Sequence, residues 1–328
     1  MKSLFVAMTP ARAEDVCGPE TRALLESRFA IRWGTESFGI EELQAQVPGT
    51  DVLLTSWGTP PLTRDLLSGP DRPRVVAHAA GSVKRLVDPT MLDEGLTVFS
   101  AGHRIAWSVG EYCLAATLTL LRRLPQFDRR MRDGEWKPAD LRGGELTGRT
   151  VGIVGASATA RAFIALLAPF GVDVVVHDPY LEDRQAAEMG IRLGTLEEVA
   201  AASIISIHVP NTPATTGMIN SDVIKQMPDG AIVINSSRGA SVDQAALAEH
   251  VIAGRLLAAL DVFDTEPPAL DAELLRSPYV LLTPHVAGDT VEGHLALAEE
   301  VMTDAWQWME TGRRGRSFVD PARWKFAA

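Results

Sequence analysis

The sequence is poor in cysteine, has no long hydrophobic run and carries no excess of positive charge, and each absence excludes a class of protein. Its two cysteines, Cys17 and Cys113, are too few for a disulfide framework or a four-cysteine metal site, so we expect two reduced thiols. No apolar stretch approaches the roughly 18 residues of a membrane-spanning helix. The net charge of −11 disfavours nucleic acid and anionic membranes as partners, because both are polyanions.

The N-terminus and the histidines exclude two further features. The first apolar stretch, residues 4–8, is shorter than the roughly 7 to 15 residues of a secretion-signal core, so we expect a cytoplasmic protein. The histidines show no paired spacing typical of metal ligands, so we expect no metal. A small anionic substrate remains compatible with the net charge, because a local basic pocket can override the average surface.

Short strand-like runs alternate with helical patterns from the first residue, which is typical of a parallel sheet in βαβ order. Residues 1–101 contain five such runs, "LFVAM", "IRW", "DVLLTSW", "RVVAHAA" and "LTVFS". A long helical pattern follows over about 105–124, and a segment rich in Gly and Pro then interrupts the rhythm. At 328 residues, the chain is long enough for two domains.

After this break the rhythm restarts with six candidate strands, "TVGIVG", "VDVVVHD", "SIISIHV", "AIVINSS", "LAALDVF" and "YVLLTPH". Most are continuously apolar, as expected for strands covered on both faces, and the pattern predicts a doubly wound nucleotide domain. A last helical segment, about 290–312, is placed to return to the first domain. We therefore predict an α/β protein with a discontinuous substrate domain, 1–101 plus 288–328, and a nucleotide domain, 102–287. Ligand sites tend to form in the cleft between such domains.

The first strand of the predicted nucleotide domain runs into "VGIVGASATAR", an altered form of the GxGxxG dinucleotide fingerprint. Its three glycine positions hold Gly155, Ser157 and Ala160. Gly155 retains the tight turn, and Ala160 adds only a methyl group where the helix packs on the strand. The hydroxyl of Ser157 either hydrogen-bonds a phosphate oxygen or points away. The turn therefore predicts a nucleotide site and leaves the role of Ser157 open.

Asp178 supports this reading, because it lies 23 residues after Gly155 at the end of the next predicted strand. A carboxylate there accepts hydrogen bonds from both ribose hydroxyls and repels a 2′-phosphate, so it favours NAD over NADP. The backbone N–H groups of Ala158 and Thr159 would then face the pyrophosphate at the helix N-terminus. The alternative is an Asp in a turn before Pro179.

Three stretches beyond predicted strands carry reactive side chains: "INSSRGASVD" with Arg238, "LDVFDTEPP" with Glu266 and "LLTPHVAGDT" with His285. The carboxyl ends of parallel strands are where open α/β sheets bind ligands, so these side chains could converge. Arg binds a carboxylate or carbonyl through its planar fork. His exchanges a proton with the substrate oxygen, and a neighbouring Glu orients the imidazole and raises its pKa. The set predicts hydride transfer to a 2-oxo acid.

These motifs resemble the D-isomer-specific 2-hydroxyacid dehydrogenase family over essentially the whole chain. The matching stretches are "GELTGRTVGIVG", "HDPY", "HVPNTPATTGMI", "MPDGAIVINSSRG", "AALDVFDTEP" and "LLTPHVAG". The spacings of 28 residues from Arg238 to Glu266 and 19 from Glu266 to His285 agree with the family's catalytic trio. The resemblance implies two Rossmann-like domains, the first flavodoxin-like, and an NAD-dependent enzyme similar to phosphoglycerate dehydrogenases and glyoxylate or hydroxypyruvate reductases, without a regulatory domain.

The resemblance also implies roles for individual residues. Arg238 would bind substrate, His285 would be the acid/base, Glu266 its partner, and the backbone of Ala80, Gly81 and Ser82 would hold the substrate carboxylate. The implied cofactor contacts are Gly155, Ser157, Ala158, Thr159, Asp178, Pro210, Thr215, Ser236, Ser237, Asp261 and Gly288. A homodimer formed through the nucleotide domain, with the helix at 105–124 as the candidate surface, is a further family expectation.

Some positions depart from the family or leave alternatives open. The loop "SAGHRIAWS" differs from the usual "NAPGANAEA", which places the pocket for the substrate's side chain in doubt. Lys84 and Arg85, in the expected substrate loop, either attract a charged substrate or form a solvated basic pair. Two alternative functions remain: an NAD(H)-sensing regulator similar to corepressors, and an NADP enzyme, which the charge of Asp178 disfavours.

Overall fold

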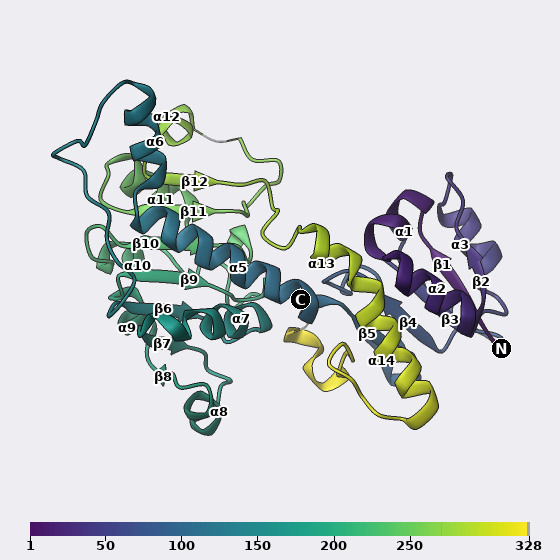
Figure 1. The fold of residues 1–328 in the computed structure, drawn as a ribbon. Coiled ribbons are helices and arrows are strands. Elements are labelled where there is room, and N and C mark those ends of the chain that lie inside the picture. The colour runs from purple at the N-terminus through teal and green to yellow at the C-terminus, as the bar shows by residue number, and fades with distance from the viewer. Residues whose placement is uncertain (270, 327–328) are drawn as a thin grey trace. The chain divides into compact units, whose positions relative to one another are not determined.

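The computed structural model describes residues 1–269 and 271–326 and divides into two units (Figure 1). The first unit consists of residues 1–105 and 289–328, and the second of residues 106–288. The boundaries expected from the sequence, after 101 and 287, lie a few residues earlier. Each unit contains one parallel sheet with helices packed on it, which confirms the predicted α/β class.

The first unit is built on a five-stranded sheet in the order β2-β1-β3-β4-β5. This is the order of flavodoxin-like folds. The strands are β1 (Lys2–Ala7), β2 (Phe29–Trp33), β3 (Val52–Thr55), β4 (Val75–His78) and β5 (Thr97–Ser100). Its helices are α1 (Pro10–Val16), α2 (Pro19–Arg28), α3 (Ile40–Gln46), α4 (Thr90–Asp93), α13 (Val291–Leu295) and α14 (Leu297–Thr311). All five strands were predicted from the sequence.

Alternation along these strands divides the side chains between two apolar layers. In β1, Leu4 and Val6 join a buried cluster that includes side chains of α1, α2 and α14, while Phe5 and Ala7 join another that includes α3 and α4. Strands covered on both faces need apolar residues at every position, which explains why these segments read as continuous apolar runs.

The C-terminal segment completes the first unit with two helices where the sequence predicted one over 290–312. Helix α13 ends at Leu295 and α14 begins at Leu297, with Ala296 between them. Thr290 caps α13, because its hydroxyl accepts a 3.1 Å hydrogen bond from the N–H of Gly293. The apolar periodicity continues through the break, so the pattern alone does not reveal it.

The second unit contains a seven-stranded sheet in the order β12-β11-β10-β9-β6-β7-β8. Its strands are β6 (Thr150–Val154), β7 (Asp173–His177), β8 (Arg192–Leu193), β9 (Ile204–Ile207), β10 (Ile232–Asn235), β11 (Leu257–Leu260) and β12 (Val280–Leu282). The chain adds β7 and β8 on one side of β6 and then β9 to β12 on the other. This reversal of strand order, between β6 and β9, is the topological switch point of doubly wound folds. The sequence predicted six strands and missed β8, because two residues are too few to show a periodic pattern.

The helices of this unit include the long α5 (Gly102–Leu121), expected over 105–124, and α6 (Leu124–Arg132). The remaining helices are α7 (Ala158–Leu167), α8 (Asp183–Glu188), α9 (Leu196–Ala200), α10 (Ser221–Gln226), α11 (Gln244–Ile252) and α12 (Ala272–Arg276). Buried side chains of α9 to α12 form one apolar cluster with strands β6, β7 and β9 to β11. No described helix is both long and apolar enough to cross a membrane.

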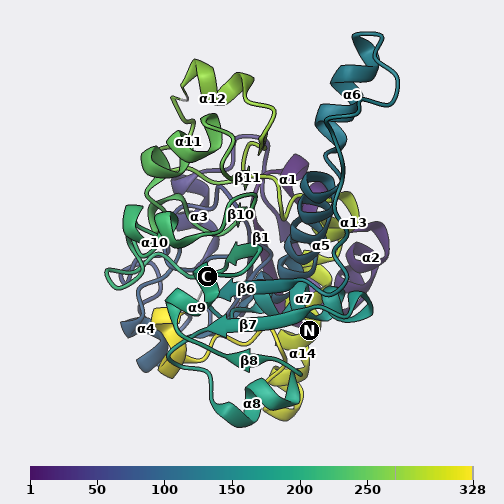
Figure 2. The same cartoon turned by 90° about the vertical axis from the view of Figure 1, so that its left-hand side faces the viewer.

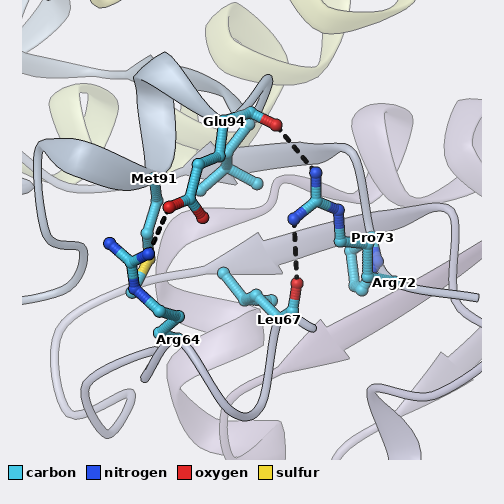
Figure 3. A pocket seen from close by; sticks show the side chains of 7 residues that line it. Arg64, Leu67, Arg72, Pro73, Met91 and Glu94 are labelled. Carbon is cyan, nitrogen blue, oxygen red and sulfur yellow. Dashed lines mark hydrogen bonds and ion pairs between the residues drawn. The ribbon is translucent and has the colours of Figure 1, made fainter. Parts of the chain in front are cut away.

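A small hollow in the first unit is structural (Figure 3). Arg64 forms an ion pair with Glu94, and Arg72 donates hydrogen bonds to the carbonyl oxygens of Leu67 and Glu94 at 3.4 and 2.7 Å. The space has room for roughly one water molecule. Because both guanidinium groups already have partners, the hollow does not resemble a substrate site.

Candidate active site

The loop that carries Arg238 follows β10 and is fixed by its own polar groups. The side chain of Asn235 donates to the carbonyl oxygen of Arg238 at 3.0 Å and accepts from the N–H of Ser237 at 3.2 Å. The hydroxyl of Ser241 donates to the same carbonyl at 2.7 Å. A Cβ at Gly239 would lie 2.0 Å from the carbonyl carbon of Phe263, so only glycine permits this close approach. The Arg238 loop therefore lies directly against the loop that leads to Glu266.

Glu266 uses both carboxylate oxygens. Its Oε1 accepts a 3.1 Å hydrogen bond from the N–H of Phe263, and its Oε2 lies 2.8 Å from Nδ1 of His285. Burial acts to raise the pKa of Glu266, but the hydrogen bonds from His285 and Phe263 and the charge of Arg238 outweigh it and lower this pKa. Glu266 is thus held as a carboxylate, with Arg238 near enough to act on its charge.

His285 has a left-handed backbone conformation, with φ of 58°. Side chains rarely adopt this region, and such strain is concentrated at functional sites. Its backbone N–H donates to the carbonyl oxygen of Asp261 at 2.8 Å, and 53% of its side chain is exposed. Since Nδ1 faces Glu266, the other ring nitrogen, Nε2, is the one available to a substrate.

Asp261 fixes the loop around His285. It is fully buried, and its carboxylate accepts hydrogen bonds from the Thr283 hydroxyl at 2.6 Å and from the N–H groups of Val286 and Ala287 at 2.8 and 2.9 Å. The hydroxyl of Thr283 also lies 2.7 Å from that of Tyr112 on α5. The sequence analysis named Asp261 among the implied cofactor contacts and missed Thr283 and Tyr112, which lack a distinctive motif. Gly288 follows this loop directly.

The nucleotide turn joins β6 to α7 and keeps the geometry of the fingerprint. Gly155 has φ of 89°, and a Cβ there would lie 2.8 Å from Cγ1 of Val209. The carboxylate of Asp178, just after β7, accepts a 2.7 Å hydrogen bond from the N–H of Ala156. Ser157 is the N-cap of α7, and Ala160 is fully buried. The first N–H groups of a helix lack intrahelical partners, so those of Ala158 and Thr159 suit a pyrophosphate.

The other expected cofactor residues lie after β9 and β10. The Thr215 hydroxyl donates to the carbonyl oxygen of Pro210 at 2.5 Å, which closes the loop after β9. The Ser237 hydroxyl donates to the carbonyl oxygen of Val209 and so joins this loop to the one after β10. Ser236 lies 3.3 Å from the buried thiol of Cys113 on α5. Hydrogen bonds thus connect the loops that hold these residues.

The expected substrate loop belongs to the first unit and is held by neutral groups. Ser56 donates to the carbonyl oxygen of Ala79 at 2.8 Å, and Ser100 donates to that of Gly81. His78, buried at the end of β4, lies 3.0 Å from the Thr55 hydroxyl. Burial lowers the pKa of His78 to about 4, so the ring is neutral. The backbone of residues 80–82 is therefore anchored on several sides.

The segment "SAGHRIAWS", expected to be a loop, is mostly the start of α5, which begins at Gly102, and only its residues 100–105 belong to the first unit. His103 and Arg104 occupy the first turn of α5, and Arg104 donates to the carbonyl oxygen of Glu292 at 3.2 Å. Burial and the charge of Asp304 raise the pKa of Glu300 to about 7, while Arg104 acts to lower it. Arg104 thus has structural partners in its own unit. Arg85 and Lys84, both in the expected substrate loop, are exposed, and Lys84 interacts with another group.

The sheet order and the turn between β6 and α7 are those of a doubly wound, dinucleotide-binding protein. Residues 114–287 match the family model "D-isomer specific 2-hydroxyacid dehydrogenase, NAD binding domain". This chain belongs to that family and carries its NAD-binding domain.

Three similar proteins illustrate the range of relatives. D-3-phosphoglycerate dehydrogenase of Mycobacterium tuberculosis is 33% identical over 305 residues, which cover 89% of this chain and 57% of that protein. Hydroxypyruvate reductase of Thermotoga maritima is 28% identical over 291 residues, covering 88% and 94%. A phosphoglycerate oxidoreductase of Rhizobium etli has a similar fold, with a TM-score of 0.82 at 23% identity over 97% and 99% of the two chains. The chain spans about half the length of the phosphoglycerate dehydrogenases that it matches.

Proposed function

We propose that this protein is an NAD-dependent oxidoreductase that interconverts small 2-oxo acids and D-2-hydroxy acids. The observation that carries the proposal is the 2.8 Å contact between Nδ1 of His285 and Oε2 of Glu266, with the charge of Arg238 acting on the same carboxylate. A structural ion pair alone would not require His285 to adopt a left-handed backbone and to remain half exposed.

His285 moves the proton. Glu266 accepts from Nδ1, which fixes the tautomer and ring orientation and stabilises the imidazolium by charge. In the reductive direction, Nε2–H donates its proton to the carbonyl oxygen of the substrate; in the oxidative direction, neutral Nε2 takes it back from the hydroxyl. Bound NADH supplies the hydride that the carbonyl carbon receives. Proton and hydride together convert the oxo acid to the hydroxy acid.

Substrate binding is assigned to Arg238 and to the loop at residues 80–82. We propose that the Arg238 guanidinium holds and polarises the 2-oxo acid group through its planar fork, and that the backbone of residues 80–82 binds the carboxylate. Asp178 would bind the ribose hydroxyls and select NAD over NADP. Glyoxylate, hydroxypyruvate or a similar small acid is the substrate class.

The test is oxidation of NADH by a panel of 2-oxo acids, run beside the variant His285→Ala. Turnover that collapses in the variant supports the proposal. Saturable NADH binding without turnover on any acid would instead favour the NAD(H)-sensing regulator. A comparison of NADH and NADPH affinities tests the role of Asp178.

We further propose a homodimer in a reducing, cytoplasmic setting. Both cysteines are free and buried, as in cytosolic proteins.

Helix α5 buries much of its apolar face inside its own unit, whereas α6 and the segment after it extend away from the sheet (Figure 2) and expose Leu124, Met131 and Trp136. A second copy would cover this apolar surface. Light scattering on the protein and on Trp136→Asp tests this: a dimer that dissociates in the variant supports the proposal, and a monomeric wild type refutes it.

A further inference from the structure

A continuous chain of polar side chains links the altered fingerprint to the interior of the second unit. The hydroxyls of Ser157 and Thr159 lie 2.9 Å apart, and the Thr159 hydroxyl lies 2.9 Å from Nδ1 of His208. Nε2 of His208 lies 2.8 Å from the hydroxyl of Ser206. His208 follows β9, and its ring packs near Phe163 of α7. The four residues form a relay from a buried strand to the N-terminus of α7.

In two arrangements of its protons, His208 and Thr159 each donate one hydrogen bond and accept one within the relay. Burial lowers the pKa of His208 to about 3, so its imidazole is neutral and carries one N–H, just as each hydroxyl carries one O–H. With the proton on Nδ1, His208 donates to Thr159, Thr159 donates to Ser157, and the Ser157 proton is left to point outward. With the proton on Nε2, each bond reverses, and Ser157 donates inward to Thr159.

Only the first arrangement suits an anion at the start of α7. Ser157 then accepts from Thr159 and, at 3.5 Å, from the N–H of Ala160, so both of its lone pairs are engaged within the protein. Its proton remains for an acceptor outside. A pyrophosphate offers acceptors only, and a donor to a charged oxygen makes a stronger hydrogen bond than a neutral pair.

We infer that His208, acting through Thr159, is a positioning residue that turns the Ser157 hydroxyl outward to donate to the dinucleotide pyrophosphate. The hydroxyl thereby replaces the close backbone approach that glycine provides at this position of the fingerprint. The inference rests on dinucleotide binding at this turn, which is part of the proposed function. In this arrangement Ser157 binds phosphate and does not point away from it.

The first test measures NADH affinity by fluorescence in single and double variants. Ser157→Ala is expected to weaken binding about tenfold, as loss of one hydrogen bond to a charged group does. Thr159→Val is expected to weaken it severalfold, Thr159→Ser to restore it, and the double variant to bind no worse than Ser157→Ala. Ser203→Ala, which removes a hydroxyl at the opposite end of β9, is the matched control and should bind normally. Thermal unfolding without cofactor identifies variants that simply lose stability.

The second test observes the His208 ring directly by ¹⁵N NMR of the NADH complex. A proton on Nδ1 with an unprotonated Nε2 supports the relay, and the opposite tautomer overturns it. Additive effects of Ser157→Ala and Thr159→Val, or unchanged affinity in both, would also overturn it while NADH still binds the wild type. If the wild type itself fails to bind NADH, the cofactor site proposed at this turn is wrong and the inference falls with it.

Discussion

The two units share a scaffold but differ in the chemistry that holds their loops. Both are parallel sheets whose loops at the carboxyl ends of the strands are tied by side-chain hydrogen bonds. In the first unit the loops after β3, β4 and β5 are tied by neutral groups of Ser56, His78 and Ser100, whereas in the second unit carboxylates of Asp261, Glu266 and Asp178 tie the loops after β6, β7, β11 and β12. The difference shows that similar scaffolds can hold their loops with different chemistry, so function must be argued from the residues of the site.

The largest effect is expected from removing His285, the proposed proton donor of the second unit. His285→Gln should lower kcat by about 10² to 10⁴-fold, the usual contribution of a positioned acid/base, with NADH affinity unchanged. The exposed His103 of the first unit is the matched control, and His103→Gln should retain activity. Equal losses in the two variants would contradict the assignment of the chemistry to the second unit.

Asp261→Asn should produce the next largest effect. The amide N–H groups of the new side chain would face one of the groups that now donate to Asp261. A buried polar group left unsatisfied in this way costs about 1 to 3 kcal/mol of stability. Because the loop positions His285, kcat should fall as well. Denaturant unfolding and kinetics measure both, with exposed Asp264→Asn as the control. A variant as stable and active as wild type would show that this carboxylate does not order the loop.

Acid should destabilise both units through their buried histidines. The pKa of His208 is lowered to about 3 and that of His78 to about 4, so the unfolded chain binds protons more readily than the folded one below pH 6.5. The free energy of unfolding is therefore highest above pH 6.5 and falls as the pH is lowered. At pH 5 the loss is about 2 kcal/mol for each of the two histidines.

Unfolding of His208→Gln and His78→Gln across this pH range checks the effect. Each variant should be less stable at pH 7 but show a flatter decline towards acid. His103→Gln, at an exposed position, should decline as the wild type does. Parallel curves for all four proteins would mean that these two rings do not set the acid response.

The smallest effect is expected in the first unit, where Gly81→Ala adds one methyl group to the substrate loop. The new Cβ would lie 3.6 Å from Ile105, an ordinary contact, so the fold should accept it. If the loop backbone binds the substrate carboxylate, KM should rise severalfold while the melting temperature stays unchanged. An unchanged KM would remove the loop from the site.

The sequence predicted the sheets, the turn and the contact between Glu266 and His285 because each has a strong local signal. Strand-like runs marked eleven of the twelve described strands, and Arg238, Glu266 and His285 each follow a strand. What it missed depends on contacts between distant residues. The two-residue β8 forms by pairing with β7, and the break at Ala296 lies within unbroken periodicity. The hydrogen bonds of buried Asp261 and the His208 relay become visible only in the folded structure. The polar residues that form them are scattered along the sequence and follow no periodic pattern.

The position of α14 has a consequence for the order in which the protein is made. Leu297, Val301 and Ala305 are fully buried in the core of the first unit, yet they leave the ribosome only after the entire second unit has been synthesised. Until then, the face of the first sheet that α14 covers remains open in the nascent chain. The second unit is therefore free to fold first, although it comes later in the sequence, and the first unit is completed last.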